Sequence, residues 1–193
     1  MELKFPVILA SQSPRRADIL KKSGFNFKII PTNITEHPYS DGSINDYVQN
    51  LAIEKAQIVA SNYPNHLIIG ADTIVMINGQ ILGKPCDEDE GQKMLQTLSG
   101  KWHKVKTAFS LVHVDSNFKQ SYIEETLVHF REISVDEIQS YIKSGSYKDK
   151  AGAYGIQDTS ASFVDSIEGC FYNVVGFPIS RFIKILKLSP FYN

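Results

Sequence analysis

The chain has 193 residues, of which 42% are hydrophobic and 21% charged, and its formal net charge at pH 7 is −1. This composition is that of an ordinary soluble globular protein with a sizeable core, and it argues against disorder. Acidic and basic residues are interspersed, so we expect neither nucleic acid nor a membrane surface as a partner. Any anion site must therefore be local.

The cysteines and the apolar stretches indicate the compartment. Cys86 and Cys170 have neither CxxC spacing nor the density of a secreted disulfide scaffold, which favours free thiols in a reducing environment. The apolar run over 5–10 lacks a basic start and a cleavage site, and no stretch approaches the roughly 20 apolar residues of a membrane span. We expect a cytosolic protein.

A predicted strand over 5–10 leads directly into a helix. Ser13 is a favourable N-cap and Pro14 fits the first helical position. Arg15 and Arg16 fall in the first turn, where cations oppose the helix dipole. A phosphate held by the helix N–H groups and the guanidiniums would explain that placement, and a solvent-facing arginine pair is the alternative.

The next segment contributes an acid and a lysine. Alternation over 25–30 predicts a second strand, and the loop that follows carries Glu36 between prolines. Without further evidence Glu36 is a solvated loop acid. Ser43 caps an amphipathic helix to about residue 61. Lys55 falls on its apolar stripe, so its ammonium either reaches the surface or points into a polar cavity as a phosphate partner.

A buried strand and a hairpin frame the most distinctive carboxylate. Residues 67–69 form an apolar run that is interrupted at Gly70 and delivers Asp72 where the run ends. Two further apolar runs joined by the Asn-Gly pair at 78–79 predict a β-hairpin that ends near Lys84. Asp72 and Lys84 then face the same space, which suits a metal-bound, multiply charged anion. An ordinary ion pair is the alternative.

The remaining elements complete an α/β pattern. They are a helix with an acidic start at 87–90, two antiparallel strands at 105–114 and 122–133, a capping-box helix over 134–144, strand signal over 162–175 and a last helix over 178–188. His103, at the front of the first of those strands, is more often structural than catalytic in such a place. We expect one domain over residues 1–193, with a mixed sheet and flanking helices.

A glycine-punctuated loop over 149–157 ends in an amide, Gln157. Glycines let backbone approach a ligand closely, and an amide together with backbone groups can recognise the edge of a planar base. An unliganded turn would have much the same sequence. The loop is therefore a candidate base-recognition element.

Seven short motifs follow one another from about residue 7 to 185. They are the segments at 9–16, 54–56, 70–73, 83–85, 98–107, 149–157 and 174–178. In this order they resemble the motifs of the Maf family of nucleoside triphosphate pyrophosphatases. The resemblance implies an inosine-triphosphatase-like α/β fold with two lobes around a deep cleft. It also implies hydrolysis of a nucleoside triphosphate between the α and β phosphorus atoms, with a divalent cation.

The resemblance assigns roles to individual residues. It makes Asp72 the proton acceptor that activates water, and it makes Arg15, Thr73 and Gln157 the positions tied to substrate choice. Positive charge for a triphosphate would come from Arg15, Arg16, Lys55 and Lys84, with Ser13 at the same helix start. Glu36 and Asp72 are the acids that suit Mg²⁺ or Mn²⁺. Whether Asp72 is base, metal ligand or both stays open.

Two branches of the family differ in substrate. The arginine pair, Thr73 and the glutamine loop resemble the branch that hydrolyses dTTP and UTP, whereas the sister branch, which prefers 7-methyl-GTP, usually has a bulky aromatic in place of Arg15. We expect dTTP and UTP, with modified pyrimidine triphosphates as further candidates. The family's association with septum formation leaves a non-enzymatic nucleotide-binding regulator as the alternative. Family members often form dimers, so a homodimer is a further candidate.

Overall fold

The computed structural model describes residues 3–192 except 33 and 35–38. Its strands are β1 (Val7–Ala10), β2 (Lys28–Ile29), β3 (Leu67–Ile77), β4 (Gln80–Leu82), β5 (Trp102–His113), β6 (Phe118–Phe130) and β7 (Val164–Glu168). Its helices are α1 (Pro14–Lys22), α2 (Ile44–Ala60), α3 (Glu88–Leu98), α4 (Val135–Lys143), α5 (Phe171–Val175) and α6 (Ile179–Leu188), with 3-10 turns η1 (Ala151–Ala153) and η2 (Thr159–Phe163). In this described part, none of the helices has both the length and the apolar character needed to cross a membrane.

The strands form a mixed sheet, which confirms the predicted fold class. Their order is β2-β1-β3-β5-β6-β7, with β4 paired to β3. β1 is parallel to both β2 and β3, whereas β4 and β7 are antiparallel to their partners. β5 and β6 are neighbours joined by the four residues 114–117, a connection short enough only for an antiparallel pair.

The chain divides into two compact units. The first comprises residues 1–72, 107–124 and 176–193, and the second comprises residues 73–106 and 125–175. Strands β3, β5 and β6 each contribute residues to both units.

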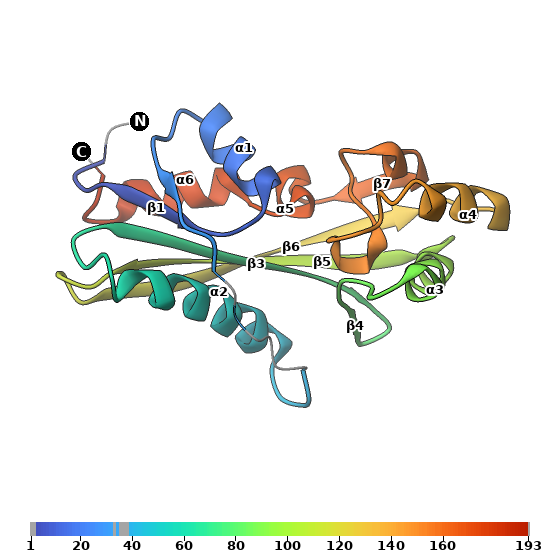
Figure 1. Cartoon of the computed structure of the whole chain (residues 1–193), viewed down its shortest axis with the longest axis horizontal. Helices are drawn as coiled ribbons and strands as arrows, with labels where there is room; N and C mark the ends of the chain where they lie inside the picture. Colours follow the sequence, from blue (N-terminus) through green and yellow to red (C-terminus); the bar gives the residue numbers. More distant parts are fainter. Residues whose placement is uncertain (1–2, 33, 35–38, 193) are drawn as a thin grey trace. The chain divides into compact units, whose positions relative to one another are not determined.

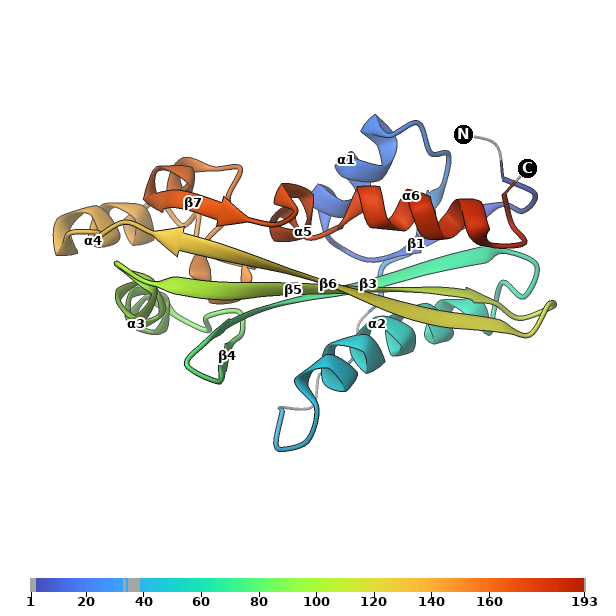
Figure 2. The same cartoon turned by 180° about the vertical axis from the view of Figure 1, so that it is seen from behind.

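In the first unit, helices cover both faces of the sheet. α2 lies on one face, and α1 and α6 lie on the other (Figures 1 and 2). On the α2 face, Ala56 and Val59 pack against Ile8 and Ile68. On the opposite face, Phe182 of α6 lies with its ring centroid 5.5 Å from that of Phe109 on β5. Side chains alternate along each strand, so both faces of this part of the sheet are apolar.

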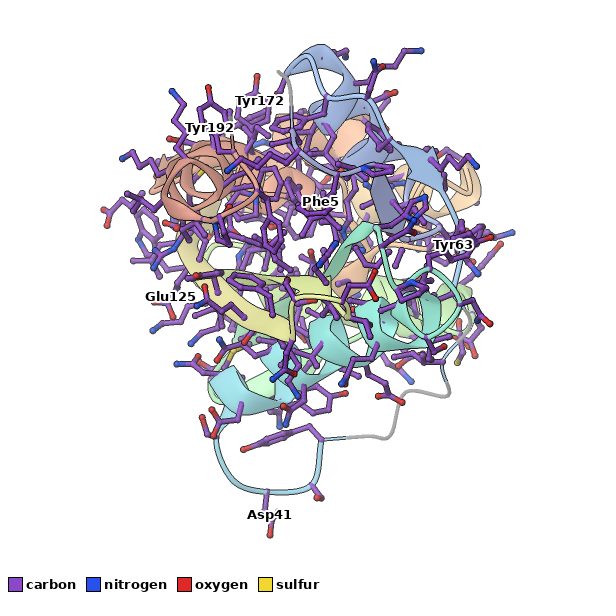
Figure 3. The ribbon with its side chains drawn as sticks, turned by 90° about the vertical axis from the view of Figure 1, so that its left-hand side faces the viewer. Phe5, Asp41, Tyr63, Glu125, Tyr172 and Tyr192 are labelled. Atoms are coloured by element: carbon purple, nitrogen blue, oxygen red, sulfur yellow. The ribbon has the colours of Figure 1, made fainter. Side chains whose placement is uncertain are left out.

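The turn before α2 lies away from this core. Its Asp41 side chain points outward from the loop (Figure 3). The Tyr39 hydroxyl donates to the Gly42 carbonyl at 2.7 Å, and Ser43 then caps the helix by accepting the N–H of Asp46 at 3.3 Å. The predicted start of α2 is thereby confirmed.

The second unit has its own core, built where α3 and α4 meet the strands. Met94, Leu95 and Leu98 of α3 are buried in one cluster with Ile138 and Ile142 of α4. The strand side chains of that cluster are Val75, Ile77, Val105, Val128 and Phe130. The predicted helix starts hold here too, because Asp87 caps α3 and Ser134 forms a capping box with Glu137.

Three predicted strands differ from the structure. The strand over 25–30 shortens to Lys28–Ile29 at the edge of the sheet. β3 is not interrupted at Gly70 but continues to Ile77, because the glycine there makes room for a helix instead of ending the strand. The apolar run over 171–175 forms α5, since a short apolar run without clear periodicity fits either a strand or a helix.

Candidate active site

The candidate site of the first unit lies at the topological switch point of the sheet, where successive connections from β1 lead to opposite sides of that strand. From β1 the chain passes through α1 to β2 on one side, and then through α2 to β3 on the other side of β1. The two crossover helices lie on opposite faces (Figure 1). Register places Ala10, the last residue of β1, beside Gly70 of β3. Open α/β sheets bind ligands beside the carboxyl ends of their strands at such a switch point.

The amino end of α1 follows β1 directly, as the sequence predicts. The Ser13 hydroxyl accepts the backbone N–H of Arg16 at 3.5 Å, and Pro14 occupies the first turn. The first turn carries no acid. The positive end of the helix dipole therefore favours an anion at this end.

Arg16 is oriented by the protein. Its Nε donates to the Gly176 carbonyl at 2.9 Å, and its Nη1 donates to the Ser11 hydroxyl at 3.2 Å. The Ser11 hydroxyl also accepts the backbone N–H of Ser13 at 3.2 Å. The sequence did not predict these contacts of Ser11, nor the contact between Arg16 and Gly176, which lies 160 positions further along the chain. Arg15, the other predicted anion ligand, is half-buried beside it.

Asp72 and Lys55 form an ion pair. Lys55 Nζ lies 2.5 Å from Asp72 Oδ1, and the two side chains are only 12% and 9% exposed. The predicted hairpin suggested Lys84 as the ammonium that shares a space with Asp72. The structure shows Lys55 against Asp72, because Asp72 lies on the face of β3 that α2 covers, in phase with Ile68. The place of Lys84 in the site stays a prediction.

Three further predicted site residues belong to the second unit. Thr73 is half-buried in β3, and alternation along the strand directs it away from the face of Asp72. Lys84 is exposed after β4, and Gln157 is exposed in the loop between η1 and η2.

The loop that carries Gln157 is held by a buried serine. Ser160 Oγ accepts the backbone N–H of Gly155 at 3.0 Å, and it lies 2.9 Å from the Gly155 carbonyl oxygen and 2.6 Å from Asp158 Oδ1. Lys150 Nζ lies 3.1 Å from the other oxygen of Asp158. The backbone of Gly155 is thus engaged within the loop, whereas Gln157 is exposed.

The loop is also fixed on its inner side. Tyr154 is buried, and its hydroxyl lies 2.8 Å from Nε2 of His103. Burial lowers the pKa of His103 to about 4, so the imidazole is neutral at pH 7. The histidine at the strand end therefore has the structural surroundings that its position suggested.

The predicted metal ligands can be compared only in part. Glu36 lies outside the residues that the structure describes. Within the described ranges, no three His, Cys, Asp or Glu side chains are grouped so as to hold a metal ion. Asp72 is thus the predicted metal ligand whose position is known.

Comparison with known proteins identifies the family. The family model for Maf-like proteins matches residues 6–189. The chain is 46% identical to a dTTP/UTP pyrophosphatase of Syntrophomonas wolfei, covering 92% of this chain and 94% of the relative. Proteins of the same name from Carboxydothermus hydrogenoformans and Bacillus cereus are 44% and 45% identical, each over 94% of this chain and over 97% and 94% of the relative. A HAM1 protein from Coxiella burnetii aligns with 96% of this chain and 100% of its own at 16% identity, but its TM-score of 0.48 is too low to carry an argument. On its sequence, this chain belongs to the family of Maf-like proteins.

Proposed function

We propose that this chain is a nucleoside triphosphate pyrophosphatase that converts dTTP and UTP to their monophosphates and pyrophosphate. The observation that carries the proposal is the buried pair of Lys55 on α2 and Asp72 on β3. Asp72 lies two residues beyond Gly70, which pairs with the last residue of β1, and β1 leads into a helix amino end with two arginines. Relatives of that name at 44–46% identity over more than nine-tenths of the chain support the same reaction.

In this reaction Asp72 acts as the general base. Its carboxylate takes a proton from the attacking water, whose oxygen bonds to the α-phosphorus. The bond from that phosphorus to the bridging oxygen breaks, and pyrophosphate leaves with the electron pair. Lys55, 2.5 Å away, orients the carboxylate and compensates its charge at a site where few water molecules can do so.

Cations and backbone groups hold the triphosphate. The amino end of α1, with Arg15 and Arg16, binds phosphate oxygens, and Lys84 adds a further positive charge. Thr73 and Gln157 act in substrate choice, with the exposed amide of Gln157 contacting the edge of the base.

A divalent metal that arrives with the substrate would need few ligands from the protein. Mg²⁺ is commonly held by one or two carboxylates together with phosphate oxygens and water, so a cluster of three acidic side chains is not required. Asp72 would supply one carboxylate and Glu36 a second. When bound, Mg²⁺ or Mn²⁺ would neutralise charge that develops on the phosphate oxygens.

The direct test is pyrophosphate release from dTTP, UTP, CTP, GTP, ATP and 7-methyl-GTP, with and without Mg²⁺ or Mn²⁺. We expect metal-dependent release that is fastest with dTTP and UTP. Fastest release from 7-methyl-GTP would preserve the reaction but contradict the roles of Arg15, Thr73 and Gln157 in substrate choice. Binding of nucleotides without release from any of them would instead support a regulator of septum formation.

The same proposal predicts the compartment and the partners of the enzyme. We expect the enzyme to act on free nucleotides in the cytoplasm, with no nucleic acid or membrane as a partner. Light scattering after size-exclusion chromatography would establish whether it is a monomer or a homodimer.

A further inference from the structure

α2 passes very close to β3 at Gly70. A methyl group on Gly70 would lie 2.1 Å from the carbonyl oxygen of Ala52 and 2.9 Å from the amide nitrogen of Ala56. Both are backbone atoms of a regular helix, so they cannot be displaced without moving the helix itself. Cβ atoms essentially never approach a neighbour closer than 3.0 Å. Only glycine therefore allows α2 to lie at this distance from β3.

A second strand holds the helix at the same point. Ser110 on β5 is fully buried, and its hydroxyl donates to the Ala52 carbonyl at 2.7 Å. The same hydroxyl oxygen would lie 2.9 Å from a methyl group on Gly70. Gly70 sets how near the helix can come, and Ser110 attaches it there.

This contact is adjacent to the ion pair on both elements. Asp72 follows Gly70 by two residues, so it projects from the same face of β3 about 6.6 Å along the strand. Lys55 follows Ala52 by three residues, about 4.5 Å along the helix axis. A displacement of α2 at Gly70 would therefore move the base of the Lys55 side chain by nearly the same amount.

We propose that Gly70 and Ser110 are positioning residues for catalysis, which hold α2 at the distance from β3 at which Lys55 reaches Asp72. This inference rests on the proposed function. Neither Gly70 nor Ser110 contacts the substrate, and both act through the geometry of the Lys55–Asp72 pair. The small side chains of Ala52 and Ala56, both fully buried, are what allow the helix to approach so closely.

A double-mutant cycle tests the proposal, with kcat and KM for dTTP measured for Gly70→Ala, Lys55→Met and the pair. Alanine at position 70 would push α2 outward by about 1 Å, and displacements of that size can cost about 10²-fold in rate. We expect Gly70→Ala alone to lower kcat by about 10–100-fold. In the Lys55→Met background the same change should alter kcat by less than about threefold, because the pair is already lost.

Ser110→Ala provides a milder variant if Gly70→Ala does not fold. It removes one hydrogen bond and adds no atom, and we expect a loss in kcat of up to about tenfold that again disappears in the Lys55→Met background. Crystals of whichever variant folds give a readout independent of activity. There the distance from Lys55 Nζ to Asp72 Oδ1 should exceed about 3.5 Å.

Gly91→Ala is the matched control for a packing defect. Gly91 lies in α3, where a methyl group would meet Ile142 and Tyr147 side-chain atoms at 3.0 Å, and we expect kcat to change by less than about twofold. Equal losses from Gly70→Ala with and without Lys55, or an unchanged ion-pair distance, would overturn the positioning role. Retained activity in Asp72→Asn would overturn the proposed mechanism instead, so the two failures are distinguishable.

Discussion

The carboxylate of Asp72 is buried and paired with the buried ammonium of Lys55. Under the proposed mechanism, its loss should affect turnover more than nucleotide binding. We predict that Asp72→Asn lowers kcat by about 10²–10⁴-fold, the range expected for the loss of a general base. The amide keeps the shape of the carboxylate, so nucleotide binding measured by calorimetry should largely persist. Asp46→Asn, an exposed carboxylate in the first turn of α2, is the control and should retain activity within about twofold. Undiminished turnover by Asp72→Asn would make Asp72 a structural residue.

Gln157 is exposed at the tip of its loop, where a side chain contributes little to packing. We predict that Gln157→Ala reduces the preference for dTTP and UTP over CTP more than it slows turnover of the best substrate. The physical reason is that the base edge then lacks the amide that would distinguish it, while the reacting groups are unaffected. Values of kcat/KM across the nucleotide panel measure this, with Gln139→Ala on α4 as the control. An unchanged ranking of substrates would exclude Gln157 from base recognition.

The loop from Tyr154 to Asp158 depends on a residue outside it. Ser160 satisfies the N–H of Gly155, and removing its hydroxyl would take away the partner of that partly buried group. We predict that Ser160→Ala lowers the free energy of unfolding by about 1–3 kcal/mol and also weakens discrimination among bases. Urea unfolding and the nucleotide panel provide the two measurements. Ser162→Ala, at an exposed serine two residues further on, should change neither, and identical results for both variants would contradict the prediction.

The elements that sequence predicts well are those specified locally. Ser13, Ser43 and Ser134 cap their helices as expected, since an N-cap involves a residue and the helix turn that follows it. The Asn78-Gly79 turn adopts positive φ at both residues, as its hairpin requires. Sequence misjudged Gly70, because the reason for that glycine is the backbone of α2, some 15 residues earlier in the chain.

In the candidate site, too, the locally specified features could be predicted from the sequence and the features that depend on tertiary packing could not. Asp72, Lys55 and the α1 amino end are recognisable because motifs mark them, and Lys55 also violates the apolar stripe of its helix. The pairing of Lys55 with Asp72 could not be predicted, because it depends on how α2 packs on the sheet. Ser110 carries no local signal, since its partner is the carbonyl of Ala52, 58 positions earlier in the chain. The partners of Ser11 and Ser160 are each within five residues, but no sequence pattern marks these serines as loop-holding residues.

Stability of the folded molecule should depend on the protonation of His103. Its pKa is lowered from 6.5 to about 4 by burial, so on acidification the unfolded chain takes up the proton first. The contribution of the neutral, buried His103 side chain to the free energy of unfolding is fully present above about pH 6.5, and it is lost as the pH falls towards 4. At pH 4.5 the loss from this residue should be about 2–3 kcal/mol.

Comparison with His103→Gln isolates that contribution from those of the carboxylates. Urea unfolding at pH 7 and pH 4.5 can be followed by the fluorescence of Trp102, the single tryptophan, which lies in the second unit beside His103. We predict that the wild-type protein loses more stability between the two pH values than the variant does. Equal losses would show that His103 does not resist protonation in the folded protein.

The chain passes between the two units four times, and this route affects how the protein can be made. The second unit is complete once residue 175 has been synthesised, whereas the first requires residues 176–193 as well. At about 5–20 residues per second, those residues follow Asp72 off the ribosome by roughly 5–20 s. Arg16 donates to the carbonyl of Gly176, so the amino end of α1 acquires this contact only then. A nascent chain stalled before residue 176 would thus contain every residue of the second unit, while Arg16 would still lack its contact with Gly176.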